Sequence, residues 1–366
     1  MMKLWWSQVK SIVRLEMKKT FFARRGLWIY ILALLPLLLF IAQGFVASHE
    51  RGRNTEMAAQ SEKRLTGDDL RAVHPEMTTD EVIALLGKPP VRFRWNQRRQ
   101  AESGEVTMVP HEDFRYSDGA NTLFIDFEDG KVSSLNIRQA YNLPDDSVVF
   151  AGVFQFFYLR LAIFFGCLGI FMNLFRGEIL DKSLHFYFLA PVRRDVLMVG
   201  KFLAGLLATC VIFMTSELLQ IIVFTGQYSP NARDLYLSQN HGLAHAAAYL
   251  GVTALACLGY GAFFLAAGML FKNPILPAAS ILVWEAANPF LPALLKKFSV
   301  IYYLKSLCPV DIPTPPGTRP LLALLVSNSD PVSTPMAILG IVCVALLVLY
   351  VSSFQVRRLE INYTSE

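Results

Sequence analysis

Three charged side chains fall inside long apolar runs of the sequence. Arg160, Glu217 and Glu285 each lie roughly ten residues, a helical rise of about 15 Å, from one end of such a run. In a membrane the three would reach the middle of the bilayer, where an ionisable group is expensive and is a candidate functional residue. Arg160 is expected to pair with Glu217 or with Glu285. Such a pair would be either a buried ion pair that holds helices together or part of a substrate or gating site, and both interpretations stay open.

Two histidines stand four residues apart in the segment His241-Gly-Leu-Ala-His245. This spacing puts them on one face of a helix, as in some zinc sites. No glutamate follows the first histidine, unlike in the zinc-protease motif. We therefore interpret them as interfacial histidines at the outer membrane edge and expect no metal. The five cysteines show no paired spacing for a metal or a disulfide framework.

The chain contains no phosphate-binding Walker A sequence, G-x-x-x-x-G-K-[ST]. The pair Gly200-Lys201 is followed by Phe202, and no glycine stands five residues before Gly200. We expect no catalytic residues, no cofactor bound by this chain and no ATP hydrolysis by this route. Any ATP-driven function would need a partner subunit.

The elements that hold these residues are predicted to be membrane helices. The sequence is 54% hydrophobic, and several apolar runs exceed the roughly 18 residues needed to cross a bilayer. Backbone groups in lipid must pair internally, so such runs should be helical. We predict a polytopic α-helical membrane protein with six transmembrane helices over residues 27–47, 148–175, 202–226, 246–271, 275–295 and 336–354. The fifth run is punctuated by prolines.

Basic residues crowd the N-terminal side of the first run, so the positive-inside rule predicts a cytoplasmic N-terminus. Six spans return the tail, residues 355–366, to the cytoplasm and place residues 48–147 outside the cell's inner (plasma) membrane. The first run lacks a small-residue cleavage site and is expected to be a retained span. The charges flank spans and form no stripe on a soluble domain, which argues against nucleic-acid binding.

The first 26 residues are predicted to form a cytoplasmic amphipathic helix. Basic residues recur on one face of residues 3–20, and Trp6, Val9, Val13 and Met17 share the other. Such a helix would lie in the membrane interface, in contact with lipid. It is interpreted as an anchor, and contact with a partner is also open.

Residues 48–147 are predicted to form a small extracytoplasmic α+β domain. Thr78-Thr79-Asp80-Glu81 has the order of a capping box, and Gly87 would end the short helix that follows. Asp129-Gly130 between two alternating segments indicates a β-hairpin. The motifs Met77 to Val82, Leu86 to Pro89, Phe114 to Tyr116 and Phe127 to Val132 resemble the BamE-like small outer-membrane lipoprotein fold. That resemblance implies a module for contact with an envelope protein or with substrate, without catalysis.

A charged segment, residues 176–201, separates the second and third runs. An acidic residue is followed by an apolar patch, a proline, a basic pair and an apolar pair before Gly200-Lys201. This order resembles the loop between the second and third spans of type-2 ATP-binding-cassette (ABC) transporter permeases. The resemblance implies a short coupling helix that docks onto a separate ATPase. Its expected contact residues are Glu178, Asp181, Leu184, His185, Phe186, Tyr187, Leu189, Pro191, Arg193 and Arg194.

The same resemblance, over residues 148–354 and the first span, implies the permease subunit of an ATP-driven exporter. It implies two ABC ATPase subunits that hold ATP and Mg, a second permease copy, and helices in residues 296–335 that dip back into the membrane. The substrate stays open. The alternative for residues 176–201 is an interfacial helix that lies on the lipid headgroups without a protein partner. For the whole chain the alternative is a membrane-anchored scaffold whose external domain recruits an envelope partner without transport.

Overall fold

The computed structural model describes residues 2–22, 26–100, 106–139, 143–180, 189, 192–271, 273, 275–312 and 332–357. They form two compact units, one of Met1–Phe40 with Asp146–Glu366 and the other of Ile41–Asp145. The boundary between the units falls within a single helix, α2 (Leu27–Gln60).

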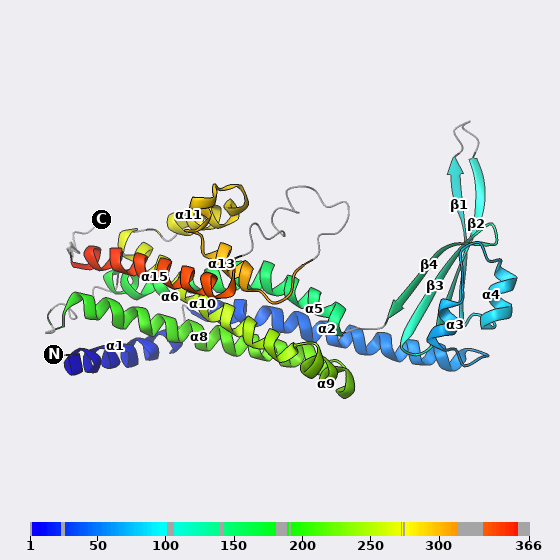
Figure 1. Ribbon diagram of the computed structural model, residues 1–366, viewed down its shortest axis with the longest axis horizontal. Coiled ribbons are helices and arrows are strands. Elements are labelled where there is room, and N and C mark those ends of the chain that lie inside the picture. Colours follow the sequence, from blue (N-terminus) through cyan, green and yellow to red (C-terminus); the bar gives the residue numbers. More distant parts are fainter. Residues whose placement is uncertain are drawn as a thin grey trace. The chain divides into compact units, whose positions relative to one another are not determined.

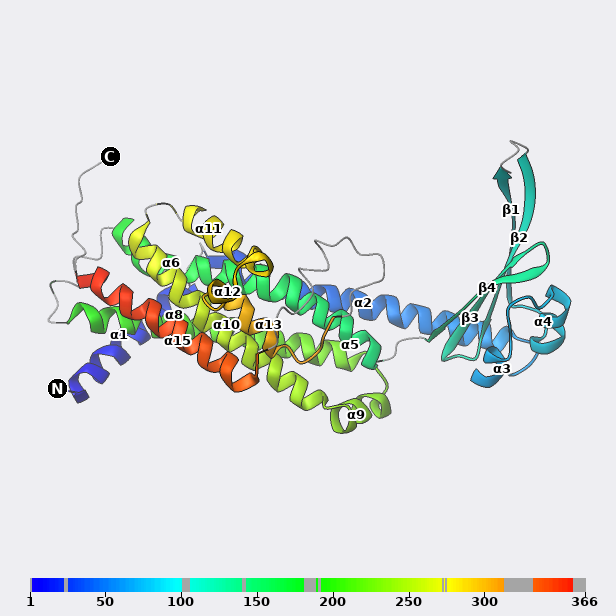
Figure 2. The ribbon, with the colours of Figure 1, turned by 45° about the horizontal axis from the view of Figure 1, so that its top comes forward.

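The first unit is helical, and its long helices lie side by side in both Figure 1 and Figure 2. Helix α10 packs against α6, α8 and α15, and α1 packs against α8. Besides the start of α2, its elements are α1 (Met2–Phe22), α5 (Leu143–Gly152), η2 (Val153–Ile163), α6 (Phe164–Leu180), α8 (Arg194–Gly226), α9 (Pro230–Gln239), α10 (Gly242–Leu270), α11 (Ile275–Ala286), η3 (Asn288–Phe290), α12 (Ala293–Lys296), α13 (Val300–Leu307) and α15 (Thr334–Arg357).

Five helices in the described part of the chain are long and apolar enough to cross a membrane. They are Leu27–Gln60, Asp146–Glu178, Arg194–Gly226, Gly242–Leu270 and Thr334–Arg357. They coincide with five of the six runs predicted from the sequence. The chain thus has the helix lengths and hydropathy of a multi-pass membrane protein.

The prediction of an unbroken helical span over residues 275–295 is wrong. Helix α11 has 12 residues and ends at Ala286, before η3 and the four-residue α12. Twelve residues rise only about 18 Å, short of the roughly 30 Å of a hydrocarbon core. Pro289 and Pro292 explain the break, because proline has no N–H for the helical ladder and clashes with the preceding turn.

The end of α15 lies beside the start of α8. The Arg357 Nε donates to Asp195 Oδ1 at 2.9 Å, and Arg194 Nη1 donates to the Arg357 carbonyl at 2.8 Å. Helix α13 packs against two of the long helices, α10 and α15 (Figure 2). The chain therefore runs from the end of α10, through the broken segment 275–312, to an α15 that returns to the start of α8.

The second span is interrupted by π-helix over 11 residues, Val153–Ile163. Extended π-helix is rare in proteins and is frequently found at functional sites. Arg160 lies within this segment. The sequence predicts an ordinary helix here, because apolar composition alone does not distinguish the two ladders.

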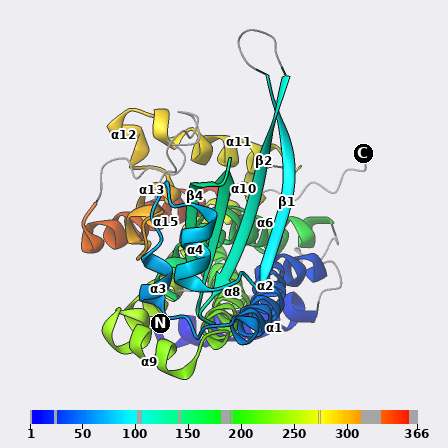
Figure 3. The ribbon, with the colours of Figure 1, turned by 90° about the vertical axis from the view of Figure 1, so that its right-hand side faces the viewer.

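The second unit contains a four-stranded antiparallel sheet in the order β1-β2-β3-β4. The short helices α3 (Gly67–Arg71) and α4 (Thr79–Leu86) cover one face of it (Figure 3). The core between them contains Val82, Leu86, Phe114, Ile125 and Phe127. The strands are β1 (Val91–Gln100), β2 (Val106–Ser117), β3 (Asn121–Glu128) and β4 (Lys131–Gln139).

The turn and cap predicted in this unit are confirmed. The Thr78 side chain accepts from the Glu81 N–H, and the Glu81 carboxylate accepts from the Thr78 N–H at 2.8 Å. Asp129 and Gly130 both have positive φ, as a two-residue hairpin turn requires. A second capping box, which the sequence analysis missed, joins Thr66 and Asp69 at the start of α3.

Candidate functional site

A buried lysine ties three helices together at the start of α8. Lys201 Nζ donates to Glu16 Oε1 on α1 and to the Leu174 carbonyl on α6, each at 2.8 Å. It also lies 2.7 Å from Glu178 Oε2 on α6, a contact that is ionic without the geometry of a hydrogen bond. Lys201 is fully buried, and both glutamates are almost so. We call Glu16, Lys19, Glu178 and Lys201 the Lys201 cluster.

The two residues of the Gly200-Lys201 pair have separate roles in this contact. A Cβ on Gly200 would lie 2.9 Å from Ile12 Cγ2, so the glycine permits the close approach of α1 to α8. Lys201 then supplies the cation for the carboxylates that this approach brings in. The pair thus joins helices, a role unrelated to phosphate binding.

Glu178 is placed by this cluster inside the helical unit. Its Oε1 accepts from Lys19 Nζ of α1 at 3.1 Å, while Oε2 faces Lys201. A carboxylate held between two cations of its own chain is buried at the base of the predicted coupling segment. Its direct effect there is to fix where α6 ends.

The basic pair after the predicted coupling segment is also held within the chain. The Arg193 guanidinium lies 5.1 Å from the centre of the Trp5 ring of α1 and 3.6 Å from Asp195 Oδ2. Arg194 donates to the last carbonyls of α15. Leu189, in contrast, is 79% exposed. The remaining predicted contact residues, Asp181, Leu184, His185, Phe186, Tyr187 and Pro191, lie outside the described residues.

Glu285 caps the helix that follows it in the broken segment. Its Oε1 accepts from the Val300 N–H at 3.0 Å. Its Oε2 accepts from the Ile301 N–H and from Ser299 Oγ, each at 2.8 Å. A carboxylate at a helix N-terminus satisfies orphan N–H groups and favours the positive end of the helix dipole. Glu285 thus fastens α11 to the start of α13.

Arg160 is oriented toward this same region. Its guanidinium lies 5.3 Å from the centre of the Phe156 ring. The charges of Arg160 and Glu285 act on one another, whereas Glu217 is not among the groups that act on Arg160 in the described residues. Of the two partners left open by the sequence, the structure therefore favours Glu285.

Glu217 of α8 is isolated. Its side chain has no exposed surface, and neither carboxylate oxygen has a hydrogen-bond partner among the described residues. The Tyr249 hydroxyl and Thr253 Oγ1 of α10 are likewise buried without a partner there. Of the three charges predicted to reach the middle of the membrane, Arg160 and Glu285 thus act on one another, and Glu217 has no hydrogen-bond partner among the described residues.

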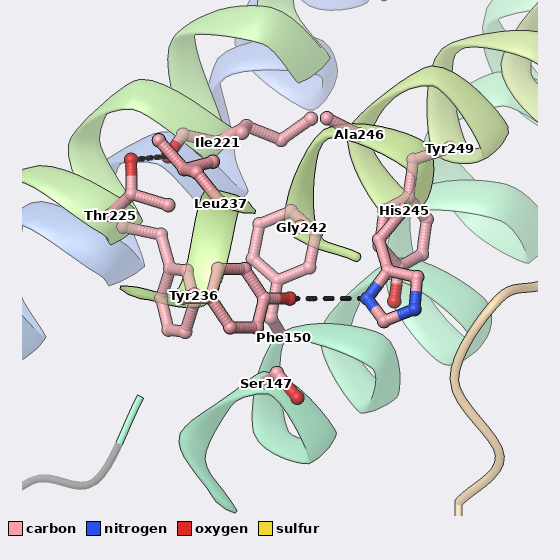
Figure 4. A pocket seen from close by; sticks show the side chains of 11 residues that line it. Ser147, Phe150, Ile221, Thr225, Tyr236, Leu237, Gly242, His245, Ala246 and Tyr249 are labelled. Carbon is pink, nitrogen blue, oxygen red and sulfur yellow. Dashed lines mark hydrogen bonds between the residues drawn. The ribbon is translucent and has the colours of Figure 1, made fainter. Parts of the chain in front are cut away.

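A pocket of about 360 Å³, which includes space open to solvent, lies at the Gly226 end of α8 (Figure 4). Across it the Tyr236 hydroxyl and His245 Nδ1 are 3.3 Å apart. Burial raises the pKa of Tyr236, so its hydroxyl stays neutral and available as a donor. The lining is Ser147, Phe150, Ile221, Phe224, Thr225, Tyr236, Leu237, Gly242, His245, Ala246 and Tyr249.

Neither histidine of the sequence pair gathers a metal site. His241 begins α10 with φ of 56°, and His245 faces Tyr236. No group of three metal-ligating side chains occurs among the residues that the structure describes.

Sequence reasoning missed the Lys201 cluster, although two signals for it were present. Glu16 is an acidic residue in a strongly basic helix, and Lys201 lies seven residues inside a long apolar helix. A lysine at that depth requires a partner. The pocket was missed as well, because Ser147 and Phe150 of its lining are distant in sequence from the rest, which falls within residues 221–249.

No protein-family model matches the chain, and comparisons with curated proteins and with solved structures found no similar protein. The function must therefore be inferred from the residues and their geometry.

Proposed function

We propose that this protein is the membrane-spanning permease subunit of an ATP-driven exporter of the type-2 ABC class. The observation that carries the proposal is the Lys201 cluster. It joins α1, the end of α6 and the start of α8 at the two ends of the segment that resembles a coupling loop. In this proposal, a partner that acts on residues 181–193 pulls on two helix ends, which buried ion pairs join to each other and to α1.

The proposed topology has six crossings and both termini in the cytoplasm. Five long helices alone would leave the termini on opposite sides. However, α15 ends at the start of α8, with Arg357 paired to Asp195. In this proposal the sixth crossing is shared by α11, η3, α12 and α13, and Glu285 supports it by satisfying backbone groups where the helix is interrupted.

The proposed partners are those that the resemblance to type-2 permeases implies. Two ATPase subunits would hold ATP and Mg, and a second permease copy would complete the pathway. The exposed side chain of Leu189, four residues before Arg193, suits the docking of an apolar helix in a groove with a charged rim. The proposed location is the inner (plasma) membrane, with the sheet unit outside the cell membrane.

The test is purification of the tagged full-length chain in mild detergent from its own cell, with mass spectrometry and an ATP-hydrolysis assay. We expect a stoichiometric partner with a Walker A sequence and vanadate-sensitive turnover. The double variant Phe186→Asp/Tyr187→Asp should lose that partner. Leu235→Asp, at an exposed site on α9, is the matched control and should retain it. Recovery of the wild-type chain without any ATPase would contradict the proposal.

A second candidate is a membrane-anchored scaffold, favoured by one feature of the sheet unit. On the sheet face without helices, Phe93 and Trp95 are exposed, and Arg115 lies 5.0 Å from the Phe93 ring and 5.3 Å from the Phe124 ring. Exposed aromatics with arginine are common at protein interfaces. Capture of an envelope protein that is lost on Phe93→Ser/Trp95→Ser, in the absence of an ATPase, would favour this candidate.

A further inference from the structure

The interior of the helical unit contains a carboxyl group that has neither a counter-charge nor a hydrogen-bond donor among the described residues. Glu217 is fully buried, and both of its oxygens lack a partner there. Its neighbours on α8 behave differently. Ser216 Oγ donates to the Ala33 carbonyl of α2, and Thr209 Oγ1 donates to the Gly205 carbonyl. Ser216 and Thr209 are thus satisfied by the backbone, whereas Glu217 is not.

An unpaired carboxylate in such a place is unstable. Transfer of an ionised carboxylate to an apolar interior is so costly that the group takes up a proton instead. Among the described residues, the titratable side chains within electrostatic reach of Glu217 are Tyr158 on η2, Tyr249 on α10 and Cys308 after α13. None of them is basic, so the neutral acid is the stable form in this conformation.

A neutral acid kept only for packing would still need an acceptor for its O–H. Tyr158 shows the usual solution, since its hydroxyl donates to the Phe213 carbonyl. Glu217 has no such acceptor among the described residues, while the Tyr249 hydroxyl and Thr253 Oγ1 are also left without partners. Three buried polar groups without partners among the described residues, on two helices that pack together, call for an explanation.

The pocket at the Gly226 end of α8 supplies the access. Ile221 lines it and lies one helical turn, about 6 Å, beyond Glu217 on the same face of α8. Tyr249 lines the pocket too and is within electrostatic reach of Glu217 (Figure 4). Tyr249 therefore contacts the pocket and interacts with the carboxyl, and in this proposal a movement of its side chain opens the one to the other.

We propose that Glu217 is a proton-binding site of the membrane domain and that it exchanges its proton with water through this pocket. The step is dissociation of the Glu217 carboxylic acid into a carboxylate and a proton that passes to water in the pocket. Rebinding reverses it. The inference concerns the helical unit alone and does not depend on an ATPase partner.

The test uses the full-length chain in lipid vesicles of known orientation, with dicyclohexylcarbodiimide as the probe. This apolar reagent adds the protonated acid across one C=N bond, and the adduct rearranges to a stable N-acylurea that peptide mass spectrometry locates. We expect labelling at Glu217 and none at Glu178, which is held between Lys19 and Lys201. Above the pH at which Glu217 is half protonated, labelling should fall about tenfold for each unit by which the pH on the pocket side is raised. Labelling that follows the pH of the opposite side would overturn the route.

Infrared spectroscopy of the same vesicles keeps the proposal testable if the reagent does not reach the site. The C=O band of a protonated carboxyl should be present in wild type, shrink as pH rises, and be absent from Glu217→Gln. Absence of that band in wild type would overturn the proposal, because Glu217 would then be ionised and paired. A band that persists at every pH would also overturn it and leave a permanently protonated structural acid. Ala246→Phe, which fills the pocket, should slow the response to a pH jump without changing its end point.

Discussion

Helix α8 contains two buried ionisable residues, one near each end, with opposite surroundings. At the start of the helix, Lys201 is enclosed by Glu16, Glu178 and a backbone carbonyl, all within 2.8 Å. Sixteen residues and about 24 Å further along, Glu217 has no such partner among the described residues. Both side chains have no exposed surface. Burial alone therefore does not decide what a charged residue does in this unit.

The difference lies in compensation. In the Lys201 cluster every charge meets an opposite one on another helix, so the ions hold α1, α6 and α8 together. At Glu217 the titratable groups nearby in the described part of the chain are hydroxyls and a thiol, so the carboxyl can respond to its environment by gaining or losing a proton. The first region is suited to transmit force and the second to change state.

The strongest test of this difference between the two ends of α8 is to remove the Lys201 cation. We expect Lys201→Met to lower the free energy of unfolding by about 3–5 kcal/mol, because two buried carboxylates lose the charge they share. The matched control is Lys19→Met, since Lys19 also pairs with Glu178 but is half exposed. It should cost less than about 1 kcal/mol. If denaturation in mixed micelles gave the same loss of unfolding free energy for Lys201→Met and Lys19→Met, burial of the ion pair would be unimportant for stability.

Removal of the carboxylate at the broken segment should have a smaller effect. Glu285→Ala removes the acceptor of the Ser299 hydroxyl and of two N–H groups at the start of α13, and loss of the side chain that caps a helix costs about 0.5–2 kcal/mol. We expect faster hydrogen exchange at Val300 and Ile301 and a lower melting temperature. Ser299→Ala removes only one of the three bonds and is the control. Unchanged exchange at both amides would rule out the capping role.

These roles mark the limit of what the sequence could predict. The long spans were predictable because about 20 apolar residues in a row have few other solutions. The break at Ala286 was signalled by prolines, but the consequence was not, since the cap for α13 comes from a glutamate 15 residues earlier in the chain. The π-helix has no compositional signature.

The candidate site was harder to predict than the spans for a related reason. Sequence reasoning located Arg160, Glu217 and Glu285 at similar depths, but depth does not specify which way a side chain faces around its helix. Lys201 and Glu16 are 185 residues apart, and only the packing of α1 on α8 brings them together. Local signals fared better in the sheet unit, where the Thr78 cap involves residues three apart.

The carboxylate of Glu81 in the Thr78 cap has a third kind of surroundings. It is exposed, and it accepts a hydrogen bond from the backbone. Hydrogen bonds from Thr78 lower the pKa of Glu81, and bonds from Thr66 likewise lower the pKa of Asp69. A lowered folded-state pKa adds stability that is present above the unfolded value and is lost as pH falls through the folded one. We expect α3 and α4 to exchange amide hydrogens faster at acid pH, relative to the strands. Glu81→Gln should remove the pH dependence in α4 alone. A dependence that survives in α4 would point to another acid.

Among the buried ionisable residues, the smallest expected effect on stability is at Glu217, and this small effect is itself diagnostic. Glu217→Gln replaces a neutral acid with a neutral amide of nearly the same volume, so it should change the free energy of unfolding by less than about 1.5 kcal/mol. The same measurement on Lys201→Met provides the scale. If Glu217→Gln were as damaging as Lys201→Met, the carboxyl would be ionised and held by a cation, and the two ends of α8 would be alike. A nearly silent Glu217→Gln instead leaves a buried acid that the fold does not need for its stability, which is what a site kept for proton exchange requires.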